Sequence, residues 1–147
     1  AGFDGAEPIT NEQLLATDCD YLVPAALGEV ITGENANSVR ARVVVEAANH
    51  PVTPPGDAVL AARGIVVLPD ILINAGGVTV SYFEWTQNIQ QFRWSLERVN
   101  QELEARMVAA FGGLMGRAAK DGTRVRQAAF DVAVERVARA IRLRGFV

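Results

Sequence analysis

Three short, uninterrupted apolar runs constrain the fold of this chain more than any other feature. They lie at residues 21–23, 43–45 and 65–68. Continuous apolar runs of this length are typical of strands that are covered on both faces, as in parallel sheets. The sequence therefore predicts an α/β fold built on a parallel sheet.

The segments between these runs have the length of helices. One extends from about residue 29 to residue 39, and the other has Thr53 as its expected N-cap, Pro54 at its first helical position and Gly64 just past its end. A capping-box pattern at residues 10–13, TNEQ, predicts a further short helix before the first strand. Strands that alternate with helices in this way predict a β-α-β-α-β unit with right-handed crossovers.

After Asn74 the sequence has the pattern of helices only. Apolar residues recur there at steps of three and four, and we interpret both stripes as packing surfaces. The first stripe consists of Leu96, Val99, Leu103, Met107, Ala110 and Leu114, and the second of Phe130, Val134, Val137 and Ile141 before a closing Gly145. The first stripe also contains Gly112, Gly113 and Gly116. Each of these glycines is expected to weaken the helix, and no function can be assigned to them.

The composition is that of a globular protein of about one domain. The chain has 147 residues, of which 50% are hydrophobic and 21% charged, and its net charge is −3. The single cysteine and single histidine exclude a disulfide framework and a His/Cys metal cluster, and they favour a reducing, cytoplasmic setting. No apolar run is long enough to span a membrane. We interpret the arginines that crowd the C-terminal segment as a solvated or ion-paired face, so neither a membrane nor a nucleic acid is an expected partner.

Small or polar side chains follow each of the three apolar runs. Ala25 and Ala26 come just after the first run, Asn49 after the second and Asn74 after the third. The carboxyl ends of parallel strands meet at one edge of a sheet, where ligands bind in open α/β folds. The alanines leave room for a ligand, and each carboxamide offers donors and an acceptor suited to a ribose or another carboxamide. Two structural alternatives stay open: Asn74 as a helix cap, and Asn49 as a turn residue before Pro51.

Ser81 follows Asn74 by seven residues, so the two share one face of the expected helix and both can contact a ligand at its N-terminus. The sequence has neither a G-x-G-x-x-G nor a G-x-x-x-x-G-K-[ST] phosphate loop. Its only lysine, Lys120, is in a polar turn where we expect it to be solvated, and His50 lacks the partners of a metal site. We therefore expect no metal site in this chain and no catalytic role for Lys120.

Several longer motifs resemble the hexameric glutamate dehydrogenases, most closely the form found in plants and many bacteria. The most distinctive motif is NAGGVTVSYFEW at residues 74–85. The other matches, in the order of that family, are DYLVPAAL at 20–27, EAANHP at 46–51, LPDIL at 68–72 and RVARA at 136–140. The leucine, valine and phenylalanine dehydrogenases share NAGGV but lose the VSYFEW that follows it, so the resemblance favours glutamate.

The resemblance implies an enzyme that oxidises L-glutamate to 2-oxoglutarate and ammonia and passes a hydride to NAD or NADP. By this resemblance six residues contact ligands: Ala25 and Ala26 in the nucleotide pocket, Asn49 and Asn74 at the nicotinamide ribose and carboxamide, and Val78 and Ser81 at the substrate. The partner of Ser81 would be the side-chain carboxylate of glutamate. The family's catalytic lysine and aspartate, its glycine-rich loop and the residues that choose between NAD and NADP all precede the part that this chain resembles.

Because the chain begins with Ala1 rather than Met, we expect it to be a fragment of a longer protein. Residues 1–73 would form the second half of a Rossmann-like, three-layer αβα dinucleotide-binding domain, and residues 74–147 long helices that return towards the substrate domain. The fragment alone is expected to be inactive, and the full-length protein to be a cytoplasmic homohexamer. The alternative is a free-standing, non-catalytic nucleotide-binding or regulatory module derived from an amino-acid dehydrogenase.

Overall fold

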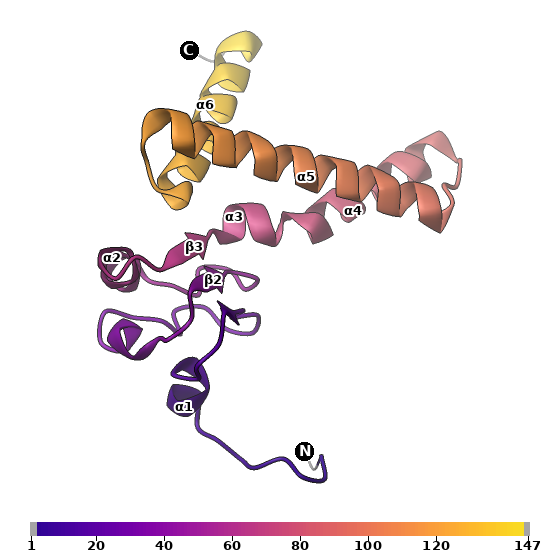
Figure 1. The fold of residues 1–147 in the computed structure, drawn as a ribbon. Coiled ribbons are helices and arrows are strands. Elements are labelled where there is room, and N and C mark those ends of the chain that lie inside the picture. Colours follow the sequence, from indigo (N-terminus) through magenta and orange to yellow (C-terminus); the bar gives the residue numbers. More distant parts are fainter. Residues whose placement is uncertain (1–2, 146–147) are drawn as a thin grey trace. The chain divides into compact units, whose positions relative to one another are not determined.

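The computed structural model describes residues 3–145 (Figure 1). The chain divides into two compact units, Ala1–Val67 and Leu68–Val147, and each has its own hydrophobic core. The first elements are α1 (Asn11–Leu15), β1 (Tyr21–Leu22), the 3-10 helix η1 (Ala36–Ser38), β2 (Val43–Val45), α2 (Pro54–Ala62) and β3 (Val66–Leu68), and the boundary falls within β3. The second unit continues with α3 (Asp70–Ile73), α4 (Ala75–Gln90), α5 (Leu96–Asp121) and α6 (Val125–Arg144). Over the described residues, every helix is too short or too polar to span a bilayer.

The three strands form one sheet in the order β1-β2-β3. β1 and β2 pair in parallel, with Tyr21 opposite Val43 and Leu22 opposite Val44. The predicted α/β fold with a parallel sheet is confirmed. β1 and β3 are each one residue shorter than the apolar runs that predicted them.

One face of the sheet packs on the core of the first unit. The buried residues of this core include Leu15, Ile31, Val39, Val44, Val52, Leu60 and Val67. On the other face, Tyr21 of β1 and Val66 of β3 are 68% and 44% exposed. The strand side chains therefore alternate between the core and an accessible surface.

Helices α1 and α2 begin where their capping patterns predict. Thr10 and Gln13 form a capping box: Thr10 Oγ1 accepts from the Gln13 amide at 3.2 Å, and Gln13 Oε1 accepts from the Thr10 amide at 2.8 Å. Thr53 Oγ1 accepts from the Gly56 amide at 3.3 Å, and Pro54 occupies the first position of α2. These bonds satisfy amides that a helix N-terminus leaves without an intrahelical partner.

The α-helix predicted between the first two strands is absent from the described residues, so this prediction is wrong. Residues 29–39 form a loop in which η1 is the only helical turn. The Asn35 side chain holds the loop, because its Oδ1 accepts from the Thr32 amide and its Nδ2 donates to the Val30 carbonyl, both at 2.8 Å. Asparagine and threonine compete with helix formation by such local bonds between side chain and backbone.

In the second unit, α5 and α6 pack against each other (Figure 1). Their buried contacts include Leu114 and Ala118 of α5 and Ala128 and Ala129 of α6. Beside them, Arg117 of α5 donates two hydrogen bonds to the carboxylate of Glu135 on α6, at 2.9 and 3.0 Å, and another to Asp121. The hydrogen bonds from Arg117 hold the pKa of the Glu135 carboxyl below its usual range.

The second apolar stripe, on α6, is exposed, so the prediction that it is a packing surface is wrong. On α5, Leu114 is buried and Val99, Leu103 and Met107 are half-buried, whereas Leu96 and Ala110 are exposed. Leu96 of α5 is 75% exposed, and Val134 and Val137 of α6 are 63% and 60% exposed. Helix α6 packs instead through a different face, on which Ala128 and Ala129 allow close approach to α5. Small side chains bring two helix backbones nearer than the larger stripe residues would.

The three glycines of the first stripe lie within α5 and do not interrupt it. Helix α5 is continuous from Leu96 to Asp121. A Cβ added at Gly112, Gly113 or Gly116 would meet no atom within 4 Å. No close helix contact in the described chain therefore requires glycine at these positions.

Candidate cofactor and substrate site

Backbone hydrogen bonds join the loops that follow β1 and β2. The Pro24 carbonyl accepts from the amides of Ala47 at 3.1 Å and Ala48 at 2.8 Å. Pro24 is buried, whereas Ala25 and Ala26 directly after it are exposed. The two alanines thus lie at the carboxyl edge of the sheet, the position predicted for them, where each presents only a methyl group.

Asn49 is exposed in the loop after β2. The residues that follow it pair with the loop after β1: the Glu29 amide donates to the His50 carbonyl at 2.8 Å, and the Ile31 amide to the Pro51 carbonyl at 2.9 Å. Hydrogen bonds to the loop after β1 therefore hold the chain both before and after Asn49. The first unit brings Asn49 to the same edge of the sheet as the two alanines.

Two residues next to this loop adopt the left-handed backbone conformation that glycine and asparagine favour. Glu29 has a φ of 55° and His50 a φ of 49°, and Nε2 of His50 lies 4.0 Å from Oε1 of Glu29. This conformation costs about 1–2 kcal/mol for a residue with a Cβ, and such strain gathers at ligand sites. The pair could not be predicted from the sequence, because neither glutamate nor histidine signals a left-handed turn.

In the second unit, Asn74 lies between α3 and α4. Its backbone ends α3, but its side chain forms no capping hydrogen bond with α4. Asn74 therefore occupies the cap position of α4 without the side-chain hydrogen bond by which a cap stabilises a helix. Val78 and Ser81 follow on α4 by four and seven residues, which places all three on one face of the helix. Val78 is 74% exposed, and Ser81 is exposed as well.

Ser81 carries the hydroxyl of this face. Its Oγ donates to the Gly77 carbonyl at 3.1 Å, and Thr86 makes the same kind of bond to the Tyr82 carbonyl at 2.9 Å. A carboxylate offers a stronger, charge-assisted hydrogen bond than a backbone carbonyl does. The exposed Ser81 hydroxyl is therefore a donor of the kind that a carboxylate accepts from.

The opposite face of α4 is fixed by stacked aromatic and guanidinium groups. Phe83 is buried, and its ring centroid lies 5.5 Å from that of Trp94. Arg106 of α5 lies 5.1 Å from the Phe83 ring, and Arg98 lies 4.1 Å from the Trp94 ring. These contacts orient α4 against α5 and leave the face of Asn74, Val78 and Ser81 accessible.

Catalytic and metal-binding groups are scarce in the described residues. Lys120, the only lysine of the sequence, is exposed in the last turn of α5. Among residues 3–145, no group of three or more histidine, cysteine, aspartate and glutamate side chains is placed to hold a metal ion.

A parallel three-stranded sheet with helices, followed by a run of helices, is the architecture of a Rossmann-like α/β domain. A family model described as Glutamate/Leucine/Phenylalanine/Valine dehydrogenase matches residues 2–145. The chain belongs to this family of amino-acid dehydrogenases. The resemblance seen in the sequence motifs is thereby confirmed.

Solved structures of glutamate dehydrogenases resemble the chain over most of its length. The enzyme from Peptoniphilus asaccharolyticus is 46% identical, with a TM-score of 0.78 over 85% of this chain and 32% of that one. The hetero-hexameric enzyme from Thermus thermophilus, in its Leu-bound form, is 35% identical, with a TM-score of 0.91 over 96% of this chain and 34% of that one. The Plasmodium falciparum enzyme is 25% identical, with a TM-score of 0.81 over 89% of this chain and 29% of that one. The chain thus spans about a third of the length of these enzymes.

Proposed function

We propose that this chain is part of a glutamate dehydrogenase, which oxidises L-glutamate to 2-oxoglutarate and ammonia with hydride transfer to NAD or NADP. The observation that carries the proposal is the face of α4, where an exposed Ser81 hydroxyl lies on the same side as Val78 and Asn74. An amino acid with a second carboxylate gains a hydrogen bond from such a hydroxyl, whereas a purely aliphatic substrate does not. The identities to three glutamate dehydrogenases support the same choice.

The cofactor in this proposal binds along the carboxyl edge of the sheet. Ala25 and Ala26 leave room for the nucleotide, and the exposed Asn49 carboxamide offers donors and an acceptor to the nicotinamide ribose. Asn74, at the junction of α3 and α4, holds the nicotinamide carboxamide with its own side-chain carboxamide. The bound cofactor supplies the hydride acceptor, while these residues bind and orient it.

The proposal also covers the organisation of the longer protein. Residues 1–73 are the second half of the dinucleotide-binding domain, and residues 74–147 are helices that return to the substrate domain. The division of the chain after Val67 supports a boundary in this region.

The 147 residues alone are inactive, because catalytic acid-base groups contribute several powers of ten to a rate and the only lysine is exposed on α5. We place the full-length enzyme in the cytoplasm as a homohexamer.

The substitution Ser81→Ala in the full-length enzyme tests the substrate. We expect kcat/KM for L-glutamate to fall by roughly ten- to a hundredfold, because one hydrogen bond to a charged group is lost. The kcat/KM for L-norvaline should stay nearly constant. Norvaline has a similar carbon chain without the side-chain carboxylate. Steady-state kinetics with both amino acids measure the ratio.

Thr86→Val is the matched control, because Thr86 is on the same helix and its hydroxyl makes the same kind of bond to the backbone. This variant should leave the ratio of the two substrates unchanged. An equal fall for both substrates in Ser81→Ala would show that Ser81 contributes to packing and would remove it from the substrate site.

A further inference from the structure

The two ends of α4 differ in what surrounds them. Val78 and Ser81 lie in its first two turns and are exposed, whereas its last turns contact α5 and the segment that joins the two helices. A helix moves largely as one rigid body, so contacts at one end set the direction of side chains at the other. The contacts of the last turns therefore bear on the direction in which the Ser81 hydroxyl points.

The packed face of α4 is fixed at Phe83. This side chain is 1% exposed, and its ring lies 5.5 Å from the Trp94 ring and 5.1 Å from the guanidinium carbon of Arg106. At 3.6 residues per turn, Phe83 is about 200° around the helix from Ser81. Phe83 thus anchors the face opposite to the one that carries the hydroxyl.

Gln87, one turn after Phe83, joins α4 to the segment that leads into α5. Its Oε1 accepts from the Trp94 amide at 2.7 Å, and its Nε2 donates to the Phe83 carbonyl at 3.2 Å. Both bonds are partly buried. The bond to Phe83 stays within α4 and orients the carboxamide, whereas the bond to Trp94 connects the helix to the chain that returns along it.

The backbone of Gln87 also takes part in this turn. Its carbonyl accepts from the amides of Gln91 and Phe92, the latter at 3.2 Å. Gln91 ends α4 with a φ of 51°, a left-handed conformation in which a residue with a Cβ is strained. Such a conformation persists only where other contacts hold it. The side-chain bond from Gln87 to Trp94 is a contact of this kind.

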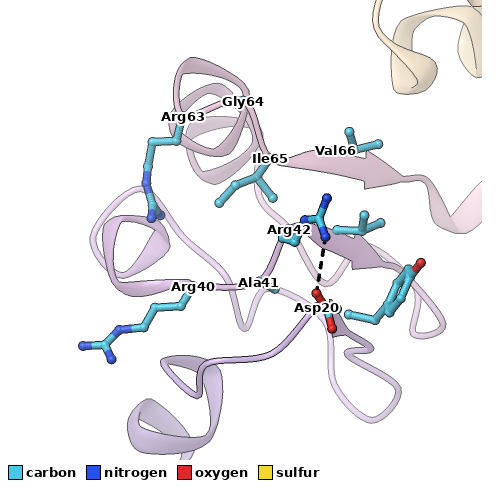
Figure 2. Close-up of a pocket in the computed structure, with 10 residues that line it drawn as sticks. Asp20, Arg40, Ala41, Arg42, Arg63, Gly64, Ile65 and Val66 are labelled. Atoms are coloured by element: carbon cyan, nitrogen blue, oxygen red, sulfur yellow. Dashed lines mark ion pairs between the residues drawn. The ribbon is translucent and has the colours of Figure 1, made fainter.

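An exposed ion pair in the first unit shows how little a solvated contact can fix. Figure 2 shows Arg42 beside Asp20 in a depression of about 740 Å³, with Arg40 pointing away from Arg42. The Arg42–Asp20 pair is long, at 3.6 Å, and its side chains are 83% and 71% exposed, so water competes for both partners. The bonds of Gln87 are shorter and partly buried, and such bonds are stronger because water is excluded.

We propose that Gln87 is a positioning residue for the substrate: its bond to Trp94 fixes α4 against α5 and thereby aims the Ser81 hydroxyl. This inference rests on the proposed function, in which Ser81 contacts the side-chain carboxylate of glutamate. A hydrogen bond weakens steeply as its angle departs from the optimum, so a small rotation of α4 reduces the preference for glutamate. Gln87 lies on a different face of α4 from Ser81 and acts through the helix.

Gln87→Met in the full-length enzyme tests this role, because methionine keeps the length of the side chain and loses both hydrogen bonds. The ratio of kcat/KM for L-glutamate to kcat/KM for L-norvaline should fall by roughly tenfold, since a misplaced donor costs only the substrate that uses it. Gln87→Glu keeps an acceptor for the Trp94 amide and should retain the ratio within about twofold. Gln90→Met is the control at an exposed glutamine of the same helix and should leave the ratio unchanged.

Hydrogen exchange at the Trp94 amide gives a measurement that does not depend on activity. Exchange should be faster in Gln87→Met than in the parent and close to the parent in Gln87→Glu. Faster exchange with an unchanged substrate ratio, or an equal fall of kcat/KM for both amino acids, would overturn the positioning role and leave the proposed function intact. A low ratio in Gln87→Glu with a protected Trp94 amide would overturn it as well. A parent enzyme that does not prefer glutamate to norvaline would overturn the proposed function and this inference with it.

Discussion

At the scale of single residues, Asn74 is the residue whose proposed role in binding is most easily tested. It lies at the junction of α3 and α4, yet its side chain makes no capping hydrogen bond to α4. A helix cap of this kind contributes about 1 kcal/mol when it is present. The role that we propose for Asn74, binding the nicotinamide carboxamide, is therefore tested by measuring cofactor affinity and stability on the same variant.

In the full-length enzyme, Asn74→Ala should raise the KM for NAD(P) by roughly tenfold, because the hydrogen bonds to the carboxamide are lost. The melting temperature should change less than the loss of a cap would change it, since no capping bond to α4 is removed. Cofactor titration and thermal unfolding of the same variant give both values. Asn88→Ala, an exposed asparagine on the same helix, should leave both values unchanged. A clear loss of stability with a normal KM would contradict this role.

At the scale of elements, α5 contains three glycines that its packing does not require. Gly113 is exposed within a continuous helix, and a Cβ at this position would meet no atom within 4 Å. Gly122 differs, because it ends α5 with a φ of 63°, where a Cβ is strained. The two positions therefore predict opposite effects for the same substitution.

Gly113→Ala should stabilise the chain by about 1 kcal/mol, because alanine restricts the unfolded backbone and favours the helix. Gly122→Ala should destabilise it by about 1 kcal/mol or more, through the left-handed backbone at the helix end. Urea unfolding of both variants measures the two changes. Destabilisation by Gly113→Ala would reveal that a close contact at this glycine, not seen in the described residues, exists in solution.

The sequence could predict the elements whose signals are local, and it failed where the tertiary context decides. The apolar runs and the caps at Thr10 and Thr53 located the strands and the starts of α1 and α2, because each signal is contained in a few neighbouring residues. Residues 29–39 have the length of a helix, but the bonds of Asn35 hold them as a loop. The apolar stripe on α6 also predicted the wrong packing face for this helix. The face that packs contains Ala128 and Ala129, and their close approach to α5 depends on the partner helix.

The candidate site was predictable to the same extent. The location of Asn49 follows from its place in the segment after the apolar run at residues 43–45, and the common face of Asn74 and Ser81 follows from helix periodicity. The left-handed backbone of Glu29 and His50 was not predictable, because it arises from the pairing of two loops that are distant in sequence. The binding roles of Asn74 and Ser81 remain proposals that the variants above test.

At the scale of the whole molecule, the chain covers 29% to 34% of the three glutamate dehydrogenases described above. Within the described residues, apolar side chains on α5 and α6 stay exposed, including Leu96, Val134 and Val137. Exposed apolar surface of this kind is typical of an interface. In our proposal the substrate domain and the neighbouring subunits of the hexamer cover these helices.

The substrate profile of the full-length enzyme tests the central claim most directly. Reduction of NAD and of NADP is followed by absorbance with L-glutamate, L-leucine, L-valine or L-phenylalanine as substrate, and with the 147-residue chain alone as the control. We predict a kcat/KM for glutamate at least about a hundredfold above that for the other three, because a site built around a charged hydrogen bond discriminates strongly against substrates that lack it. The chain alone should give no turnover. A higher kcat/KM for any of the apolar amino acids, or steady turnover by the chain alone, would contradict the account.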